Sequence, residues 1–272
     1  MKNKDNHYIA RFQLAHFGVN KLLYGYDIAT GTSEHKGPKG FAYSYELYRS
    51  PTGGEDVIED GFGGLENNLA RIIRRVVADG TLVFLDKDEM RALLCFVAAQ
   101  AGRLPSIRQR AMARLGRRAS ADNIQEEFIA TMRAYFEDGG PVLSLSQARL
   151  LATYSSAFVM GDHPVVADGP LSATEIPNPL PRVWMPISPQ YTIELCDPTV
   201  KIPGGRPMPD PRDDYSRWPV VQATHVVADA EVDALNARQV SASVEKVFSR
   251  DRLSSSWVSA RRKAQVHLMA AG

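Results

Sequence analysis

The sequence predicts an α+β fold that is mostly helical, with a small N-terminal β layer and a few later strands. Apolar residues recur at helical spacing over 65–77 and 89–101, which predicts two buried helices. Strand-forming residues at 22–28, followed by a turn signal at 30–32, and alternating aromatic residues at 41–48 predict the β layer. No repeat or linker-like segment interrupts the chain, so its 272 residues are interpreted as a single domain.

This domain divides into a β-rich part at 7–50, a helical core at 62–155, a mixed part of strands and loops at 156–222, and C-terminal helices at 227–272. In the helical core, Gly80 is expected to end the first helix, Asp86 to cap the second, and Pro105 to restart it. The remaining predicted elements are a short helix or turn at 7–17, helices at 107–118, 121–135, 144–154, 232–247 and 254–272, strands at 158–160, 184–187 and 191–195, and a loop at 198–219.

The composition is that of an ordinary globular protein, with 44% hydrophobic and 23% charged residues. The net charge of +1 argues neither for nor against a polyanionic partner. No apolar stretch approaches the roughly 18 residues of a membrane span, and the charged start at 1–5 leads into no signal peptide. A cytoplasmic protein without a membrane partner is therefore expected. Cys95 and Cys196 are interpreted as small buried hydrophobes rather than as a disulfide or zinc site.

Several short motifs follow one another along the chain. They are the run from His7 to Phe17, Leu65-Glu66 at a helix start, Gln100-x-x-Arg103-x-Pro105 at a helix end, Gly161-Asp162-His163-Pro164, Pro186-Ile187-Ser188-Pro189 and Asn236. In this order the chain resembles a bacterial family called domain of unknown function 4238, from His7 to about Phe248. The resemblance implies an architecture and a short set of residues, but no reaction. The chain departs from the family pattern at Ala10, where proline is usual, and at Gly161 and His163, where serine and asparagine are common.

Five polar residues are the candidates for catalysis: His7, Glu66, Gln100, Arg103 and Asp162. A histidine works as acid or base near neutral pH, and an arginine can bind a phosphate in a forked geometry. If the five converge, they suit hydrolysis or transfer at a phosphate ester, with Glu66 and Asp162 as candidate ligands of Mg²⁺ or Mn²⁺. The alternative is a structural network in which Arg103 pairs with one of the carboxylates and holds the fold.

A basic segment follows the helical core. Arg108, Arg110, Arg114, Arg117 and Arg118 occur with no acidic residue between them, and the last four share a helical face. Such a face can follow the phosphate backbone of a nucleic acid. A solvated helix surface is the alternative interpretation.

Three weaker patterns are also present in the sequence. Arg262 and His267 fit the Arg-polar-x-x-x-His pattern of HEPN ribonucleases, which is short and frequent by chance. His163 is interpreted as a turn residue, with metal binding as the less favoured alternative. The glycines at 61–64 are taken as a flexible helix entry rather than a phosphate loop, and the chain has no nucleophile elbow.

The preferred functional hypothesis is a phosphodiester-cleaving nuclease acting on RNA or DNA, in which the segment 108–118 holds the substrate. A role as a defence or toxin effector is suggested only by the type of family. The alternative is a non-catalytic binding or assembly protein whose partner is a protein or a nucleic acid, and a third class is an enzyme acting on a small nucleotide such as NAD. Convergence of the five residues in an open cleft favours an enzyme, and burial in closed ion pairs favours the binding protein.

Overall fold

The computed structural model describes residues 5–45, 57–116, 120–137, 143, 145–171, 179–201 and 219–270. The predicted elements at 41–48, 107–118 and 198–219 therefore lie partly outside the described residues. None of the described helices has the length and apolar character that a bilayer crossing requires.

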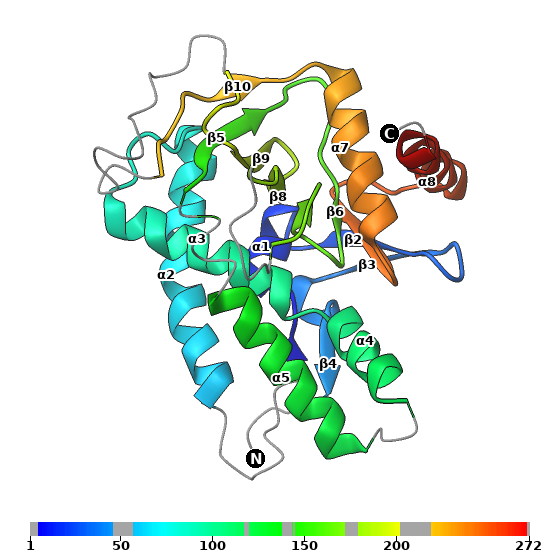
Figure 1. Ribbon diagram of the computed structural model, residues 1–272. Helices are drawn as coiled ribbons and strands as arrows, with labels where there is room; N and C mark the ends of the chain where they lie inside the picture. Colours follow the sequence, from blue (N-terminus) through cyan, green and yellow to red (C-terminus); the bar gives the residue numbers. More distant parts are fainter. Residues whose placement is uncertain are drawn as a thin grey trace.

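Among the described elements along the chain, four short strands and α1 come first, four consecutive helices (α2 to α5) follow, and six consecutive strands (β5 to β10) precede α7, β11 and α8 (Figure 1). The helices are α1 Arg11–His16, α2 Val57–Asp79, α3 Lys87–Gly102, α4 Pro105–Leu115, α5 Ala121–Glu137, α7 Asp229–Ala242 and α8 Ser255–Ala270, with a short 3₁₀ helix at Pro38–Gly40. The strands are β1 Asp5–His7, β2 Leu23–Asp27, β3 Ser33–Lys36, β4 Tyr43–Tyr45, β5 Gln147–Ala152, β6 Met160–Gly161, β7 Val166–Ala167, β8 Val183–Ser188, β9 Tyr191–Cys196, β10 His225–Val226 and β11 Lys246–Ser249.

The strands form three sheets, which confirms the predicted α+β class. A five-stranded sheet has the order β10-β5-β9-β8-β7, a four-stranded sheet has the order β3-β2-β11-β6, and β1 pairs with β4 alone. All neighbours are antiparallel except β10 and β5.

Three predicted helix boundaries are confirmed and follow from capping chemistry. Asp86 accepts a hydrogen bond from the backbone N–H of Glu89 at 2.8 Å, and the Glu89 carboxylate accepts from the N–H of Asp86 at 3.4 Å, which makes a capping box. Gly80 ends α2 with a φ of +64°, a conformation that glycine adopts at little cost. Pro105 is the first residue of α4, where its missing N–H is not needed.

The predicted start of a helix at Leu65-Glu66 is wrong, because α2 begins at Val57. The glycines at 61–64 lie within the helix rather than at its entry.

Helices cover both faces of the five-stranded sheet. On one face, Leu69 and Ile72 of α2 and Leu93 of α3 pack with Leu150 of β5 and Ile193 of β9. Burial of apolar surface stabilises a fold by about 25 cal/mol per Å². Because this layer contains the cluster with the most buried apolar residues among those described, it contributes most to stability. The three helical residues are completely buried, as the spacing within 65–77 and 89–101 predicts.

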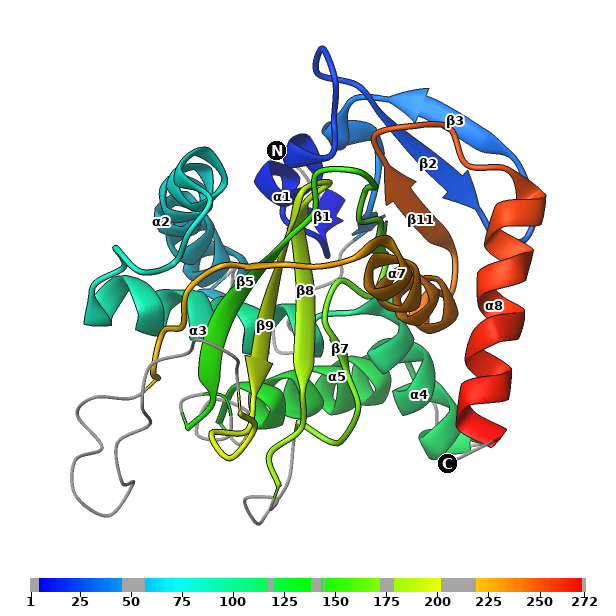
Figure 2. The same ribbon diagram turned by 90° about the horizontal axis from the view of Figure 1, so that it is seen from above.

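The second face of that sheet packs against α7. Val232 and Leu235 of α7 contact Leu151 of β5 and Trp184 of β8. Farther along the same helix, Val240 packs with Tyr26 and Val247 of the four-stranded sheet and with Val258 of α8. As a result α7 lies between the two sheets, with α8 on its outer side (Figure 2).

The predicted helix at 144–154 is wrong, since residues 147–152 form β5. Both neighbours of β5 are strands, and all six of its residues are buried. A strand that is covered on both faces does not show the alternation of polar and apolar residues that marks a half-exposed strand. Its sequence therefore cannot be distinguished from that of a buried helix by periodicity alone.

The predicted helix at 232–247 is too long, because α7 ends at Ala242 and β11 follows at Lys246–Ser249. Val247 faces Tyr26 of β2 and Gly161 of β6 in the sheet register. The C-terminal part is consequently not all helical, and the N-terminal β layer is completed by a strand from the other end of the chain. β1 and β10 are further short strands that the sequence patterns did not predict.

Candidate functional site

A buried chain of hydrogen bonds joins three of the five predicted residues. Arg103 at the end of α3 donates from Nε to Gln100 Oε1 at 2.9 Å and from Nη1 to Glu66 Oε1 on α2 at 2.6 Å. Gln100 donates to Gln13 Oε1 on α1 at 3.1 Å, and Gln13 donates to the carbonyl of Pro186 on β8 at 3.0 Å. One polar chain therefore ties α1, α2, α3 and the five-stranded sheet together.

Arg103 has an apolar environment apart from that chain. Its side chain is 1% exposed, whereas that of Glu66 is 26% exposed. The guanidinium carbon lies 4.9 Å from the ring centre of Phe62 and 5.9 Å from that of Phe96, within the range of cation–π attraction. Among the described residues, Arg103 Nη2 has no hydrogen-bond partner.

Asp162 belongs to a different network, at the turn between α7 and β11. Its Oδ1 accepts from the N–H of Val244 at 2.9 Å, and its Oδ2 accepts from the N–H groups of Glu245 at 2.5 Å and Lys246 at 3.0 Å. The side chain is buried, and no contact joins it to Arg103 among the described residues. The carboxylate thus acts as a cap for this turn.

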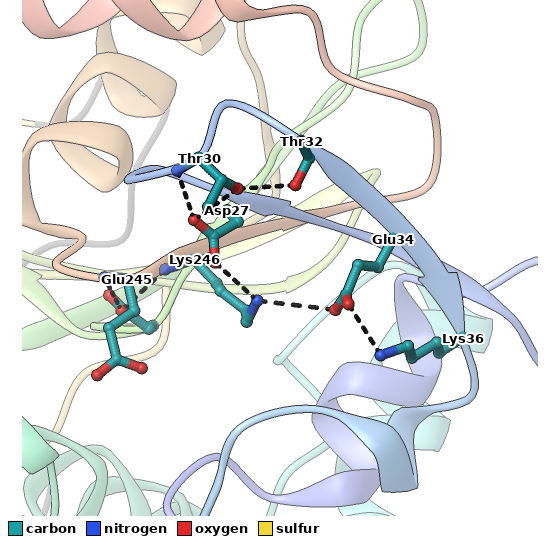
Figure 3. A network of polar contacts seen from close by, with 8 residues as sticks. Asp27, Thr30, Thr32, Glu34, Lys36, Glu245 and Lys246 are labelled. Atoms are coloured by element: carbon teal, nitrogen blue, oxygen red, sulfur yellow. Dashed lines mark hydrogen bonds and ion pairs between the residues drawn. The ribbon is translucent and has the colours of Figure 1, made fainter.

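Charged side chains continue from this turn across the surface of the four-stranded sheet (Figure 3). Lys246 Nζ lies 3.2 Å from Asp27 Oδ2 and 3.7 Å from Glu34 Oε2, and Glu34 also pairs with Lys36 at 3.0 Å. The backbone N–H of Thr30, followed by Lys246, lowers the pKa of Asp27 below its ordinary value. The Lys246–Asp27 pair links the neighbouring strands β11 and β2, whereas Glu34 and Lys36 pair within β3.

His7 and Tyr8, which start the N-terminal motif, lie at the end of β1 and directly after it. His7 pairs with Tyr43 across β1 and β4, with the two rings edge to face at 6.0 Å between centres. Tyr8 is buried, and burial, together with the negative charges of Asp162 and Glu245, raises its pKa far above the ordinary value. The Tyr8 phenol therefore stays protonated at any physiological pH.

His163 is half-buried beside Asp162. Burial lowers its pKa, the cation of Arg110 lowers it further, and the Asp162 carboxylate opposes the shift. The imidazole is accordingly neutral at pH 7. Within the described ranges, no three or more His, Cys, Asp or Glu side chains come together in an arrangement that could hold a metal ion. Glu66 and Asp162, the two candidate metal ligands, sit in separate networks.

The predicted nucleic-acid face is described only in part, since Arg117 and Arg118 lie outside the described residues. Arg114 pairs with Glu127 of α5 at 2.5 Å, so its charge is partly neutralised within the protein. Arg110 is exposed on α4, and Arg108 is half-buried. The described part of this face therefore carries less free positive charge than the sequence suggests.

The other candidates have structural partners. Arg262 donates to the carbonyl of Ser243 at 3.0 Å and so caps the C-terminal end of α7, while the side chain of His267 lies outside the described residues. Cys95 and Cys196 are free thiols, and burial raises the pKa of both, that of Cys196 to about 11. Both are consistent with protonated, unreactive side chains.

The sequence patterns did not reveal a buried charge cluster on the five-stranded sheet. Glu194 is completely buried and accepts from Arg149, from Arg182 at 2.5 Å and from the indole N–H of Trp184 at 3.0 Å. Arg149 lies directly opposite Glu194 in the register of β5 and β9. Because 144–154 was predicted as a helix, this pairing could not be anticipated. Gln13 was also missed, and its only signal was a polar residue within an apolar stripe.

One known family model matches nearly all of the chain. A family model described as a protein of unknown function, DUF4238, matches residues 5–252. The chain belongs to this family. The matched residues run from β1 to just beyond β11, so α8 lies outside the part that defines DUF4238. No curated protein and no solved structure matches the chain.

Proposed function

We propose that this chain is a binding or assembly protein in which the predicted catalytic residues stabilise the fold. The observation that carries the proposal is the buried hydrogen-bond chain of Arg103. Two of its donor groups are held by Gln100 and Glu66, and the chain continues through Gln13 to a backbone carbonyl. A buried, largely satisfied network of this kind rigidifies the elements that it connects.

The environment of Asp162 supports the same proposal. A carboxylate that acts as a base or a metal ligand must direct a lone pair at a proton or an ion. Asp162 instead directs its two oxygens at three backbone N–H groups of residues 244–246. Hydrogen bonds to a charged carboxylate are worth about 1.5–3 kcal/mol each, so this residue has a sufficient structural role.

Asp162→Asn tests that role. The amide replaces one accepting oxygen by an NH₂ group that faces backbone donors, so we expect the free energy of unfolding to fall by about 2 kcal/mol. Urea denaturation measures it. Asp88→Asn is the matched control, because the Asp88 side chain is 90% exposed, and its effect should stay within about 0.5 kcal/mol. An Asp162→Asn protein as stable as the wild type would contradict the structural role.

A cleavage assay tests the absence of nuclease chemistry. Labelled total RNA and single- and double-stranded DNA are incubated with the full chain, with and without Mg²⁺ or Mn²⁺, and a native gel of the same mixtures records binding. We expect no cleavage under any condition. The partner in this proposal is a protein or a nucleic acid in the cytoplasm, and a retarded band would favour the nucleic acid.

One observation favours a phosphodiester-directed enzyme as the second candidate. Arg103 Nη2 lacks a hydrogen-bond partner among the described residues and lies next to Glu66, whose carboxylate reaches solvent. An arginine and a carboxylate in this arrangement suit a phosphate and its attacking water. Cleavage by the wild type that is lost in a folded Glu66→Gln variant would establish this candidate, and with it the nuclease hypothesis.

A further inference from the structure

A cleft of about 330 Å³ lies between α7 and the start of α8. Its walls come from residues 156–159, which precede β6, from α7, and from the segment 249–257 that leads from β11 into α8. Figure 2 shows α7, β11 and α8 side by side in this region. The volume is at the lower end of the range for small-molecule sites.

One wall of the cleft is apolar. Phe158, Val159, Leu253 and Trp257 line it, and Phe158 and Val159 are otherwise buried in the cores beneath. The guanidinium of Arg261 lies 3.8 Å from the ring centre of Trp257 and holds the indole by a cation–π contact. A fixed aromatic side chain beside aliphatic ones suits a flat, apolar ligand body.

Both acidic residues that line the cleft in the described part of the chain are paired with arginines. Asp251 is ion-paired with Arg250 at 3.1 Å, and Asp233 is ion-paired with Arg261. Arg252 also lines the cleft, and the described residues provide it with no ion pair or side-chain hydrogen bond. Both carboxylates are thus neutralised, while one guanidinium remains available.

The first turn of α8 adds a positive potential to the cleft. Ser254 lines the cleft and accepts a hydrogen bond from the N–H of Trp257 at 3.2 Å, so it caps the helix. The positive end of the dipole of this 16-residue helix therefore lies at the edge of the cleft. The dipole supports the argument, which depends on the cleft and on Arg252.

We infer that this cleft binds a small anion with a flat, apolar body, its carboxylate or phosphate group held by Arg252 and its ring against Trp257. An arginine fork matches both kinds of anion, so the chemistry common to them is what the cleft recognises. The inference deepens the proposed binding function and rests on it. The cleavage assay tests the proposed function at Glu66 and Arg103, whereas ligand binding tests the inference at Arg252, so the failure of one can be distinguished from the failure of the other.

Isothermal titration calorimetry of the full chain tests the inference with four probes. Indole-3-acetate and adenosine monophosphate carry a ring with a carboxylate or a phosphate, and indole-3-acetamide and adenosine are their neutral counterparts. We expect saturable binding of at least one anion and at least tenfold weaker binding of its neutral counterpart, since a charged hydrogen bond is lost. The anion that binds more tightly identifies the source of the charge.

Two variants locate the site. Arg252→Gln should weaken binding of the anion about tenfold while leaving the neutral probe unchanged. Arg91→Gln, at an arginine of α3 whose side chain is 68% exposed and which does not line the cleft, should bind as the wild type does. The inference is overturned if neither anion binds, if neutral probes bind equally well, or if Arg252→Gln binds the anion as tightly as the wild type.

Discussion

At the scale of single residues, close backbone approach explains a departure from the family pattern. Gly161 on β6 donates its N–H to Gln239 Oε1 of α7 at 2.9 Å, so strand and helix backbones lie close together. A Cβ atom at Gly161 would lie 2.1 Å from Ser243 Oγ and 2.8 Å from the carbonyl oxygen of Gln239. A serine, or any other side chain, at this position would collide with α7, so the glycine is a packing requirement.

Gly161→Ala tests this explanation. Because Gln239 O belongs to the backbone and cannot rotate away, we expect a loss of about 2 kcal/mol in the free energy of unfolding. Gly63→Ala is the control, since its added Cβ meets nothing within 4 Å on α2. Replacing a glycine within a helix should stabilise the protein by about 0.5–1 kcal/mol. Equal stability of the two variants in urea denaturation would refute the packing argument.

At the scale of elements, α7 serves as the hydrogen-bonding neighbour of the segment around β6. Asn236 accepts from the N–H of Val159 and donates to the carbonyl of Ala157, both at 2.9 Å. Gln239 accepts from Gly161 and donates to the carbonyl of Pro164 at 3.1 Å. Buried backbone groups that no strand reaches are satisfied in this way by amides on one helix face.

Removing one of these amides should therefore destabilise the contact between helix and strand. Asn236→Ala leaves a buried N–H and a carbonyl without partners, and we expect a loss of about 2–3 kcal/mol. Ser241→Ala, at an exposed position on the same helix, should change stability by less than about 0.5 kcal/mol. Protection of the Val159 amide from hydrogen exchange should also fall in Asn236→Ala, and unchanged protection would argue against the role of the amide.

The strands β2 and β11 are joined by a pH-dependent contact. The N–H of Thr30 and the cation of Lys246 lower the pKa of Asp27, so its folded pKa lies below its unfolded pKa. Its contribution to stability is complete above the unfolded pKa and is lost as the pH falls through the folded one. Between pH 6 and pH 3, Asp27→Asn should lose less stability than the wild type. Identical slopes in urea denaturation at each pH would contradict this.

How far the sequence specifies an element depends on how local its signals are. Asp86, Gly80 and Pro105 act within a few residues, so the C-terminal end of α2 and the N-terminal ends of α3 and α4 could be predicted. β5 and β11 depend on partners distant in the sequence. β11 pairs with β2 about 220 residues away, and periodicity alone does not show such a pairing.

At the scale of the whole molecule, the same distinction applies to the candidate site. The proximity of Gln100 and Arg103 could be predicted from the sequence, because the two residues lie three positions apart at one helix end. Glu66 could be predicted as an ion-pair partner of Arg103. Asp162 could not be placed, because its role depends on where α7 ends and β11 begins. The partners of Gln13 and of Glu194, which are Gln100 and Arg149, lie on other elements that are distant in the sequence. Polar residues in short motifs therefore identified the core network but not its purpose.

The Arg103 chain is expected to hold α2, α3 and the sheet together. A double-mutant cycle of Glu66→Gln and Arg103→Met, measured by urea denaturation, tests it most directly. We predict that Glu66→Gln costs about 2 kcal/mol, because it removes the counterion of a buried cation, and that the two sites are coupled by at least about 1 kcal/mol. Glu126→Gln, at an exposed glutamate of α5, should have almost no effect. A Glu66→Gln protein as stable as the wild type, with no coupling to Arg103, would contradict the account.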